Sequence, residues 1–339
     1  MNLKELDKLL KSYTPQELFY KKYFDAKSHN TYYNSIKNLN LDYINNNTLT
    51  TPKSQIPLIT ENTIIGTNSN IKIQKHCRYK PGFTHSHEFF QLTYIYSGTC
   101  NQNINGRSLN LTKSNLLILA PNVPHTFKVC DNSIILNIFI CKSDFNELFQ
   151  ELLKENNVLS QFFLRSLYTN KYEDYILFYT NNDKNLKTIL LNMLSEQLNN
   201  KKYSERIITN MLLIFFQYLM QDHEKNYETS SIITKNNKDI NEILTYIQKN
   251  YASITLNQLS NKFHFSNAYL SKHLKECTGN NFSQIIKYIK LKKSCNLLKS
   301  TNMNVYQISS AVGYSSEEHF IRTFKKEFNM SPTQYRKSI

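Results

Sequence analysis

The sequence predicts a multidomain α+β fold, in which a small β-barrel and a helical segment precede an all-α domain. Three observations lead to this prediction. Short apolar runs separated by turn signals occupy residues 61–142, apolar residues at helical spacing follow in 143–232, and one helical pattern occurs twice within 233–339. With 339 residues, of which 40% are hydrophobic, the chain is long and apolar enough to bury more than one core.

The region before the all-α domain falls into three parts. Residues 1–60 mix short helical patterns with Asn-rich stretches such as NNNTLTTP, and we expect an irregular N-terminal extension. Strand-length runs such as FFQLTYIYSG and SIILNIFIC follow, with a hairpin signal at Asn105-Gly106, and this spacing is typical of a small barrel. The apolar stripes of 143–232 then predict helices that pack in the core or form a dimer seam.

The last hundred residues contain one pattern written twice. LNQLSNKFHFS begins at Leu256, and VYQISSAVGYS begins at Val305, 49 residues later, with apolar and polar residues at the same places. After one extra residue in the second copy, the two series continue in step through the basic residues Lys272 and Arg322. Two matched copies are much more specific than a single helical pair, which has a substantial false-positive risk.

Each copy carries the signals of a helix, a short turn and a second helix. Thr255 and Asn304 are N-cap residues, and each is followed three positions later by Gln. His264 and Gly313 stand in the turns, where Gly suits a left-handed backbone and His would be strained. The stretch NFSQIIKYIKLKKSCNLLKS between the copies predicts one long connecting helix.

The basic charge of the chain is concentrated in this region. The whole chain has a net charge of +15 and a pI near 9.3, and residues 235–339 hold 16 Lys and Arg against 6 Asp and Glu. Such a surface predicts a polyanionic partner, and double-stranded DNA suits the two helix-turn-helix units, 255–277 and 304–328. Two units set roughly 34 Å apart would reach the same face of one duplex.

The segment from residue 240 to 339 resembles the DNA-binding domain of the AraC/XylS family of transcription regulators. The strongest part of the resemblance is AVGYSSEEHFIRTFKKEFNMSPTQYR, which includes the expected Pro332. The resemblance implies base-facing residues in the second helix of each unit: Ala268, Ser271 and Lys272 in the first, and Glu317, Glu318 and Arg322 in the second.

Among these residues, we expect Arg322 to make a bidentate contact to guanine. Glu317 and Glu318 either complement the positive N-terminus of their helix or accept a hydrogen bond from cytosine N4, and we favour the first role. The other basic residues of this domain are expected to contact phosphates or simply to be solvated: Lys275, Lys292, Lys293, Lys325 and Lys326.

The stretch PGFTHSHEFFQLTYIYSG contains a second candidate site. His85 and His87 alternate along a predicted strand and therefore point to one face, and His125 follows further along the chain. Three converging imidazoles could hold a metal ion. The stretch resembles the cupin motifs, in which two His, a Glu and a later His bind metal, but Gln91 stands at the Glu position and removes the anionic ligand. The other interpretation is a ligand pocket lined by these side chains.

Regulators of the AraC/XylS type often carry a cupin-like sensor in this place. The resemblance therefore implies an effector pocket within residues 61–142, rich in aromatic and polar side chains. Such side chains could bind a sugar or another small polar effector. We expect the pocket to be formed by His85, His87, Gln91, Tyr94 and His125.

The leading hypothesis is a sequence-specific, effector-responsive DNA-binding transcription regulator of metabolic genes, and not an enzyme. We expect a homodimer, and RNA polymerase is a further partner if the protein is an activator. The alternative is a metal-dependent cupin enzyme that uses His85, His87 and His125, with a non-specific basic tail. Near-stoichiometric metal in chelator-free protein would favour the enzyme.

The remaining expectations concern cofactors and location. The six cysteines include no C-x-x-C pair, so we expect neither structural zinc nor another cofactor. The N-terminus MNLKELDKLLKSYTPQELFY lacks the apolar stretch of a signal peptide, and no run of eighteen apolar residues predicts a membrane span. We therefore expect a cytoplasmic protein with free thiols and no membrane partner.

Overall fold

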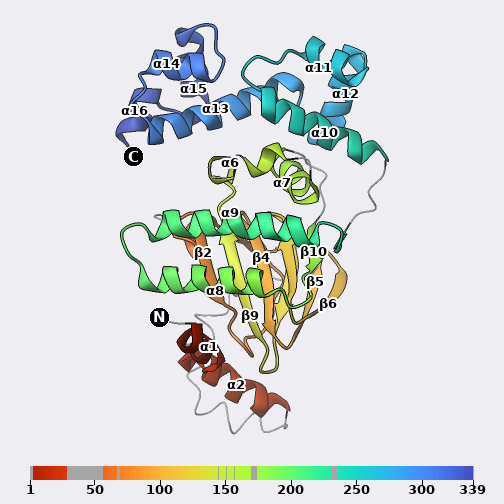
Figure 1. Cartoon of the computed structure of the whole chain (residues 1–339), viewed down its shortest axis with the longest axis vertical. Helices are drawn as coiled ribbons and strands as arrows, with labels where there is room; N and C mark the ends of the chain where they lie inside the picture. Colours follow the sequence, from red (N-terminus) through yellow and green to blue (C-terminus); the bar gives the residue numbers. More distant parts are fainter. Residues whose placement is uncertain are drawn as a thin grey trace. The chain divides into compact units, whose positions relative to one another are not determined.

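The computed structural model describes residues 3–28, 56–66, 69–143, 145–149, 151–155, 157–168, 174–230 and 235–338. These residues form two compact units, and Figure 1 labels their helices and strands. The first, here called the β-rich unit, consists of Met1–Lys142 and Asp174–Ser230. The second, the helical unit, consists of Ser143–Glu173 and Ser231–Ile339. The predicted fold class, a β-rich domain followed by an all-α domain with two helix-turn-helix units, is confirmed.

Three sheets form the framework of the β-rich unit. The largest has the strand order β11–β10–β7–β4–β9–β2, the second has the order β6–β5–β8, and β1 pairs with β3. The strands are β1 Leu58–Ile59, β2 Ile71–Lys75, β3 Ser86–His87, β4 Phe90–Ser97, β5 Thr99–Ile104, β6 Arg107–Thr112, β7 Asn115–Leu119, β8 His125–Lys128, β9 Ile134–Ile140, β10 Tyr175–Tyr179 and β11 Tyr227–Thr229.

The core lies on both sides of the largest sheet. Every residue of β7 and β9 is buried, and their sequences are almost uninterrupted apolar runs, as expected of strands that are covered on both faces. Helices α8 (Lys184–Asn199) and α9 (Ser204–His223) pack against β2 and lie across the sheet in Figure 1. Strand β5 instead alternates between exposed and buried residues, because one of its faces meets solvent.

The predicted hairpin at Asn105-Gly106 is confirmed. These two residues join β5 to β6, and Ile104 pairs with Arg107 across the turn. Asn105 has a φ of 48° and Gly106 a φ of 87°. Two consecutive positive φ values are what a type I′ turn requires, and Asn followed by Gly is the sequence that accepts them most readily.

The region 143–232, which we expected to be one helical segment, is divided between the two units. Strands β10 and β11 extend the largest sheet beyond β7, and α8 and α9 belong to the β-rich unit as well. The earlier part, with α6 (Phe145–Leu148), η1 (Leu152–Lys154) and α7 (Val158–Tyr168), belongs to the helical unit. Local periodicity identified helices here, but it cannot show that their packing partner lies far downstream.

Buried polar contacts attach α7 to α10 (Lys235–Asn250) within the helical unit. The Arg165 Nε donates a hydrogen bond to Asn241 Oδ1 at 2.6 Å, and Asn241 Nδ2 donates to Gln161 Oε1 at 2.9 Å. The Tyr168 hydroxyl donates to Gln248 Oε1 at 3.3 Å. Both α7 and η1 contact α10, and α6 contacts α13. Residues 143–173 are therefore an integral part of the helical unit.

The N-terminal extension contains two helices, α1 (Leu3–Lys11) and α2 (Pro15–Ser28), rather than irregular chain. Thr14 and Glu17 form a capping box at the start of α2, with Thr14 N donating to Glu17 Oε2 at 2.9 Å and Glu17 N donating to the Thr14 hydroxyl at 3.2 Å. The remainder of the predicted extension, residues 29–55, lies outside the described residues.

A buried ionic cluster fastens these two helices to the rest of the β-rich unit. The Glu17 side chain is fully buried and accepts hydrogen bonds from Arg78 Nε at 3.0 Å and from Lys75 Nζ at 2.8 Å. Burial alone would raise the pKa of the Glu17 carboxyl, but the hydrogen bonds from Arg78 and Lys75 outweigh it and lower the pKa from 4.5 to about 2. The carboxylate is therefore charged in the folded protein at neutral pH.

Two further properties of the chain follow from the structure. The six cysteines are thiols and not disulfides, as predicted. Among the described residues, none of the helices combines the length and the apolar character needed to cross a membrane.

Replacing Glu17 tests the importance of this cluster. We expect Glu17→Gln to lower the free energy of unfolding by about 3–5 kcal/mol, because it leaves the buried Arg78 and the largely buried Lys75 without their counter-charge. The folded-state pKa lies below the unfolded one, so this contribution is complete above about pH 4.5 and disappears as the pH falls towards 2. Urea unfolding of both proteins at several pH values measures it, with the exposed Glu205→Gln as control. Equal stability at pH 7 would contradict the expectation.

Candidate nucleic-acid interface and candidate effector pocket

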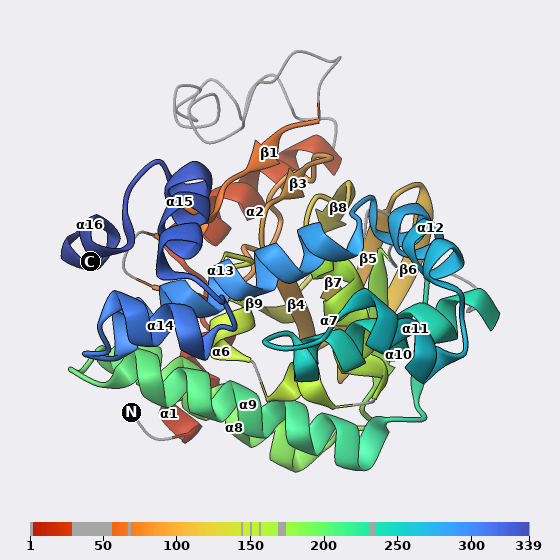
Figure 2. The same ribbon diagram turned by 90° about the horizontal axis from the view of Figure 1, so that it is seen from above.

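The two predicted helix-turn-helix units are present in the helical unit. The first consists of α11 (Leu256–Phe263) and α12 (Asn267–Thr278), and the second of α14 (Val305–Ala311) and α15 (Glu317–Phe328). They lie at opposite ends of the connecting helix α13 (Phe282–Ser300) in both Figure 1 and Figure 2. A last short helix, α16 (Pro332–Lys337), follows.

The helix starts are determined by local capping. Thr255 with Gln258 and Asn304 with Gln307 form complete capping boxes at the first helix of each unit, as predicted. Ser266 and Ser316 cap the second helices by accepting from Tyr269 N and His319 N. The connecting helix has a capping box of its own, Asn281 with Gln284, which we did not predict, although Asn-x-x-Gln was visible in the sequence.

The two turns have the same left-handed backbone but different residues. His264 has a φ of 56° and Gly313 a φ of 82°. A non-Gly residue in this conformation is strained, typically by about 1–2 kcal/mol. At Gly313 a side chain is also excluded sterically, because an added Cβ would lie 1.9 Å from the carbonyl oxygen of Ala252.

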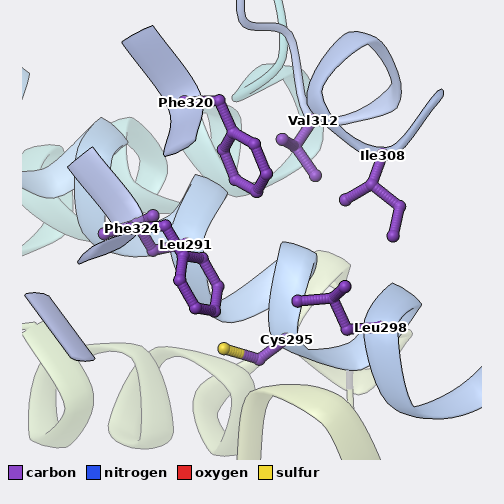
Figure 3. Packing of buried hydrophobic residues seen from close by; sticks show 7 residues of the cluster. All are labelled: Leu291, Cys295, Leu298, Ile308, Val312, Phe320 and Phe324. Carbon is purple, nitrogen blue, oxygen red and sulfur yellow. The ribbon is translucent and has the colours of Figure 1, made fainter. Parts of the chain in front are cut away.

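One apolar cluster holds the second unit against α13. Figure 3 shows its seven residues: Leu291, Cys295 and Leu298 of α13, Ile308 of α14 with Val312 directly after it, and Phe320 and Phe324 of α15. Polar contacts surround this cluster. Lys290 Nζ donates to the carbonyl oxygen of Gly313 at 2.5 Å, and Lys287 forms a 3.0 Å ion pair with Glu327. The position of α15 is therefore fixed by α13.

Most of the predicted base-facing residues lie on exposed faces. Arg322 and Glu318 are exposed on α15, opposite the buried Phe320 and Phe324. Lys272 and Ala268 are exposed at the equivalent places on α12. Ser271 and Glu317 are only half-buried, because both lie towards the side of their helix that packs inward.

The side chains next to these positions were missed by the sequence reasoning. Tyr269 is 50% exposed on α12, and His319 is exposed at the equivalent place on α15. Glu276 lies one turn beyond Lys272, and its carboxylate is 3.8 Å from the Lys272 ammonium. Each exposed helix face therefore carries an aromatic or imidazole ring beside its basic residue. Tyr269 lies about one helical turn before Lys272, and this spacing in the sequence could have identified it.

The predicted phosphate-contacting lysines do not all behave alike. Lys275, Lys325 and Lys326 are exposed. Lys293 is buried instead, and its burial, reinforced by the nearby Lys154, lowers its pKa to about 8. Its prediction as a solvated or phosphate-contacting residue was wrong, because the side of α13 that carries it faces the protein interior.

The β-rich unit contains a cavity of about 150 Å³, which we call the histidine cavity. Four of the five predicted pocket residues line it: His85, His87, Gln91 and His125. Backbone hydrogen bonds in both directions join His85 to His125, and their ring centroids are 4.3 Å apart. His76, which we did not predict, is a further lining residue.

The prediction that Tyr94 lines the pocket was wrong. It lies three residues after Gln91 on β4, and since side chains alternate along a strand, the two point to opposite faces. Tyr94 is buried away from the histidine cavity, and burial raises the pKa of its hydroxyl, which has a hydrogen bond with Ser114.

The backbone fixes the tautomers of two facing histidines. The Nδ1 of His85 lies 3.0 Å from the carbonyl oxygen of Phe83, and the Nδ1 of His125 lies 3.0 Å from that of Val123. A carbonyl oxygen only accepts, so each Nδ1 carries the proton and donates. The Nε2 of each ring is then an unprotonated acceptor. In His125 this atom is buried and has no hydrogen-bond partner among the described residues.

The same argument fixes the amide of Gln91. His87 donates from Nδ1 to the carbonyl oxygen of Phe89 at 2.8 Å, and its Nε2 lies 2.9 Å from the Gln91 amide. Because that Nε2 is an acceptor, the amide must present its NH₂ group to it. Thr93 and Asn137 lie on the other side of this amide, at 3.0 Å and 3.3 Å. The amide oxygen then accepts from the Thr93 hydroxyl, and from Asn137 once the Asn137 amide is turned in the same way, with its NH₂ group facing Gln91. Gln91 therefore completes a neutral network.

The cavity is uncharged at its histidines. Burial lowers the pKa of His76 to about 3 and that of His87 to about 4. Burial also lowers the pKa values of His85 and His125. Within the described residues, no group of three or more His, Cys, Asp or Glu side chains is arranged to hold a metal ion. The arrangement instead offers acceptors to a ligand that donates hydrogen bonds.

The two turns provide a matched pair of substitutions. We expect Gly313→Ala to destabilise the helical unit by more than about 2 kcal/mol, since it combines backbone strain with the clash at Ala252. His264→Gly should instead stabilise it by about 0.5–1 kcal/mol, because it removes the strain of a side chain at positive φ. Chemical unfolding of the full chain measures both, and a stabilised Gly313→Ala protein would contradict the geometry.

Two family models match the chain. The model of an AraC-like ligand binding domain matches residues 78–214, which include His85, His87, Gln91 and His125 of the histidine cavity. The model of a helix-turn-helix domain matches residues 259–338, which contain the second helix-turn-helix unit and the first from within α11 onward. The two matches together cover more than half of the chain.

Curated relatives agree with these matches. The Msm operon regulatory protein of Streptococcus mutans is 30% identical over 101 residues, which are 30% of this chain and 36% of that protein. The transcriptional activator RhaS of Citrobacter koseri is 22% identical over 255 residues, or 74% of this chain and 86% of RhaS. The RhaS of Escherichia coli is 21% identical over 79% of this chain and 92% of its own length.

Solved structures of similar proteins include ToxT of Vibrio cholerae, with 17% identity, a TM-score of 0.31, and 78% of this chain and 97% of that one covered. The C-terminal domain of the response regulator yesN of Fusobacterium nucleatum has 33% identity and a TM-score of 0.28, and covers 30% of this chain and 99% of that one. The relatives are regulators rather than enzymes, and the chain belongs to the AraC family of DNA-binding transcription regulators.

Proposed function

We propose that the protein regulates transcription by inserting α12 and α15 into the DNA major groove, under the control of a small polar effector bound in the histidine cavity. The observation that supports this most directly is the pair of capped helix-turn-helix units on one helix. Each unit exposes a basic residue at the equivalent place, Lys272 or Arg322. Metabolic genes are the proposed targets, and a sugar is one effector of the required chemistry.

The length of α13 suits this use. Its 19 residues correspond to roughly 28 Å at about 1.5 Å per residue. One turn of DNA is about 34 Å, so recognition helices attached near the two ends of α13 suit neighbouring segments of one major-groove face. The proposed recognition sequence therefore has two half-elements about one turn apart.

Selection of DNA from a random library by the full chain tests this proposal. We expect Arg322→Ala to weaken binding to the selected sequence by about 1–3 kcal/mol and to relax specificity at one position, since a bidentate contact to guanine carries both effects. The same substitution at the exposed Lys249, at the end of α10, is the control and should change neither. Selection of no motif, with uniform salt-sensitive binding only, would contradict the proposal.

We also propose that the protein is a homodimer joined through α9. The face of α9 turned away from the sheet carries apolar residues at spacings of four and three, Ile207, Met211, Ile214 and Tyr218, as in the seam of a coiled coil. Ile207 is 37% exposed and Ile214 is 49% exposed. A second copy of the same helix would bury this stripe. The RhaS relatives are named activators, and if this chain activates, RNA polymerase is a further partner.

Sedimentation of the full chain tests the dimer. We expect Ile214→Glu to shift the protein to monomer, because a buried carboxylate without a partner would be placed in the seam. Thr188→Glu, on an exposed position of α8, adds the same charge to the same unit and should leave the dimer intact. Dimers of equal strength in both variants would place the interface elsewhere.

A further inference from the structure

The histidine cavity has a neighbour. A second, outer cavity of about 350 Å³ lies between α2 and the start of the segment that leads to β3. Residues 80–82 line both cavities, so this short segment is the wall that they share. Phe24 and Tyr79 provide aromatic surface in the outer cavity.

The shared wall is thin because of Gly82. A Cβ added there would lie 2.7 Å from the carbonyl oxygen of Phe127, which is closer than atoms approach in a stable structure. The segment can therefore run directly against β8 only with glycine at this place. A ligand that passes this residue reaches both cavities.

The histidine cavity contains buried ring nitrogens without hydrogen-bond partners. The Nε2 of His125 is an acceptor without a partner, and the Nε2 of His76 is also buried and without a partner among the described residues. Buried polar atoms of this kind are rare in folded proteins, because the loss of water is normally compensated. Hydroxyl groups of a ligand in the histidine cavity would supply the missing partners, because a hydroxyl can donate to His125 and either donate to or accept from His76.

The lysines of the outer cavity favour a ligand group with a negative charge. Lys80 lies on the shared wall, and Lys128 lies on the far side of it at the end of β8. Neither cavity has an Asp or Glu among its described lining residues. Two ammonium groups without a lining carboxylate favour an anionic ligand group.

The volumes of the two cavities favour one ligand that extends over both of them. Ligand sites of proteins typically have about 300–1,000 Å³, and the histidine cavity, at about 150 Å³, is smaller than that. It can take only part of an effector. The outer cavity, with about 350 Å³, brings the combined space into the usual range.

We propose that the effector is a small polyhydroxylated anion, a sugar phosphate or a sugar acid, that occupies both cavities at once. One of its hydroxyl groups donates to the Nε2 of His125, and another forms a hydrogen bond with the Nε2 of His76, in the histidine cavity. Its phosphate or carboxylate lies between Lys80 and Lys128 in the outer cavity. This inference rests on the proposed effector function of the histidine cavity and specifies the chemistry of the ligand.

Thermal unfolding and calorimetry of the full chain with paired probes test the proposal. Each pair consists of a neutral sugar and its monophosphate or its carboxylate, and inorganic phosphate alone is included. We expect at least one anionic member to bind at least tenfold more tightly than its neutral partner, with an affinity that falls as salt is added. The phosphate and carboxylate members of the panel distinguish the two kinds of anion.

Substitutions in the two cavities distinguish the two contacts. Lys80→Met and Lys128→Met should remove the advantage of the anionic member, whereas Lys113→Met, an exposed lysine of the same unit, should not. His125→Leu should weaken the neutral and the anionic member alike, and His125→Gln, which keeps an acceptor, should restore part of the binding.

Several results would overturn this inference. Neutral members that bind as tightly as their anionic partners would overturn it, and so would a panel in which no anionic member binds. A third such result is anion binding that needs the lysines but has the same affinity in the His125→Leu protein. DNA selection by the wild-type protein is independent of these measurements. A selected motif together with a failed ligand panel would refute the ligand class and leave the proposed function standing.

Discussion

The packing of α13 against the helices at its two ends is the constraint on which the helical unit depends. Leu291, Cys295 and Leu298 join it to α14 and α15, and the same helix follows directly on the first unit. A recognition helix that could rotate freely would give up much of its binding energy to ordering. Because α15 is seated on a buried aromatic and aliphatic core, the second unit can present Arg322 in one orientation.

In the β-rich unit, hydrogen bonds from the main chain determine the protonation of the cavity histidines. Main-chain carbonyl oxygens hold the Nδ1 protons of His85, His87 and His125, so the ring nitrogens that face the cavity are acceptors before any ligand arrives. Gln91 satisfies the one belonging to His87. Gln91 thus belongs to a neutral network, which suits the recognition of hydroxyl groups better than the binding of a cation.

Much of this could be predicted from the sequence, because the decisive signals were local. The capping boxes at Thr255 and Asn304 and the Asn105-Gly106 turn depend on residues three positions apart or fewer, and all of them were found. The errors concern information that a local pattern does not contain. To place Tyr94 correctly, one has to know that it lies an odd number of residues from Gln91 on the same strand. To place Lys293, one has to know which side of the long helix is covered by the rest of the protein.

The assignment of residues 143–173 to the helical unit has a consequence for synthesis on the ribosome. Helix α7 is translated before β10, α8 and α9, but α10, against which it packs, follows only after them. At about 5–20 residues per second, the apolar side of α7 waits on the order of 4–16 s for its partner. During that interval the nascent chain holds α7 without the helix against which it packs in the folded protein.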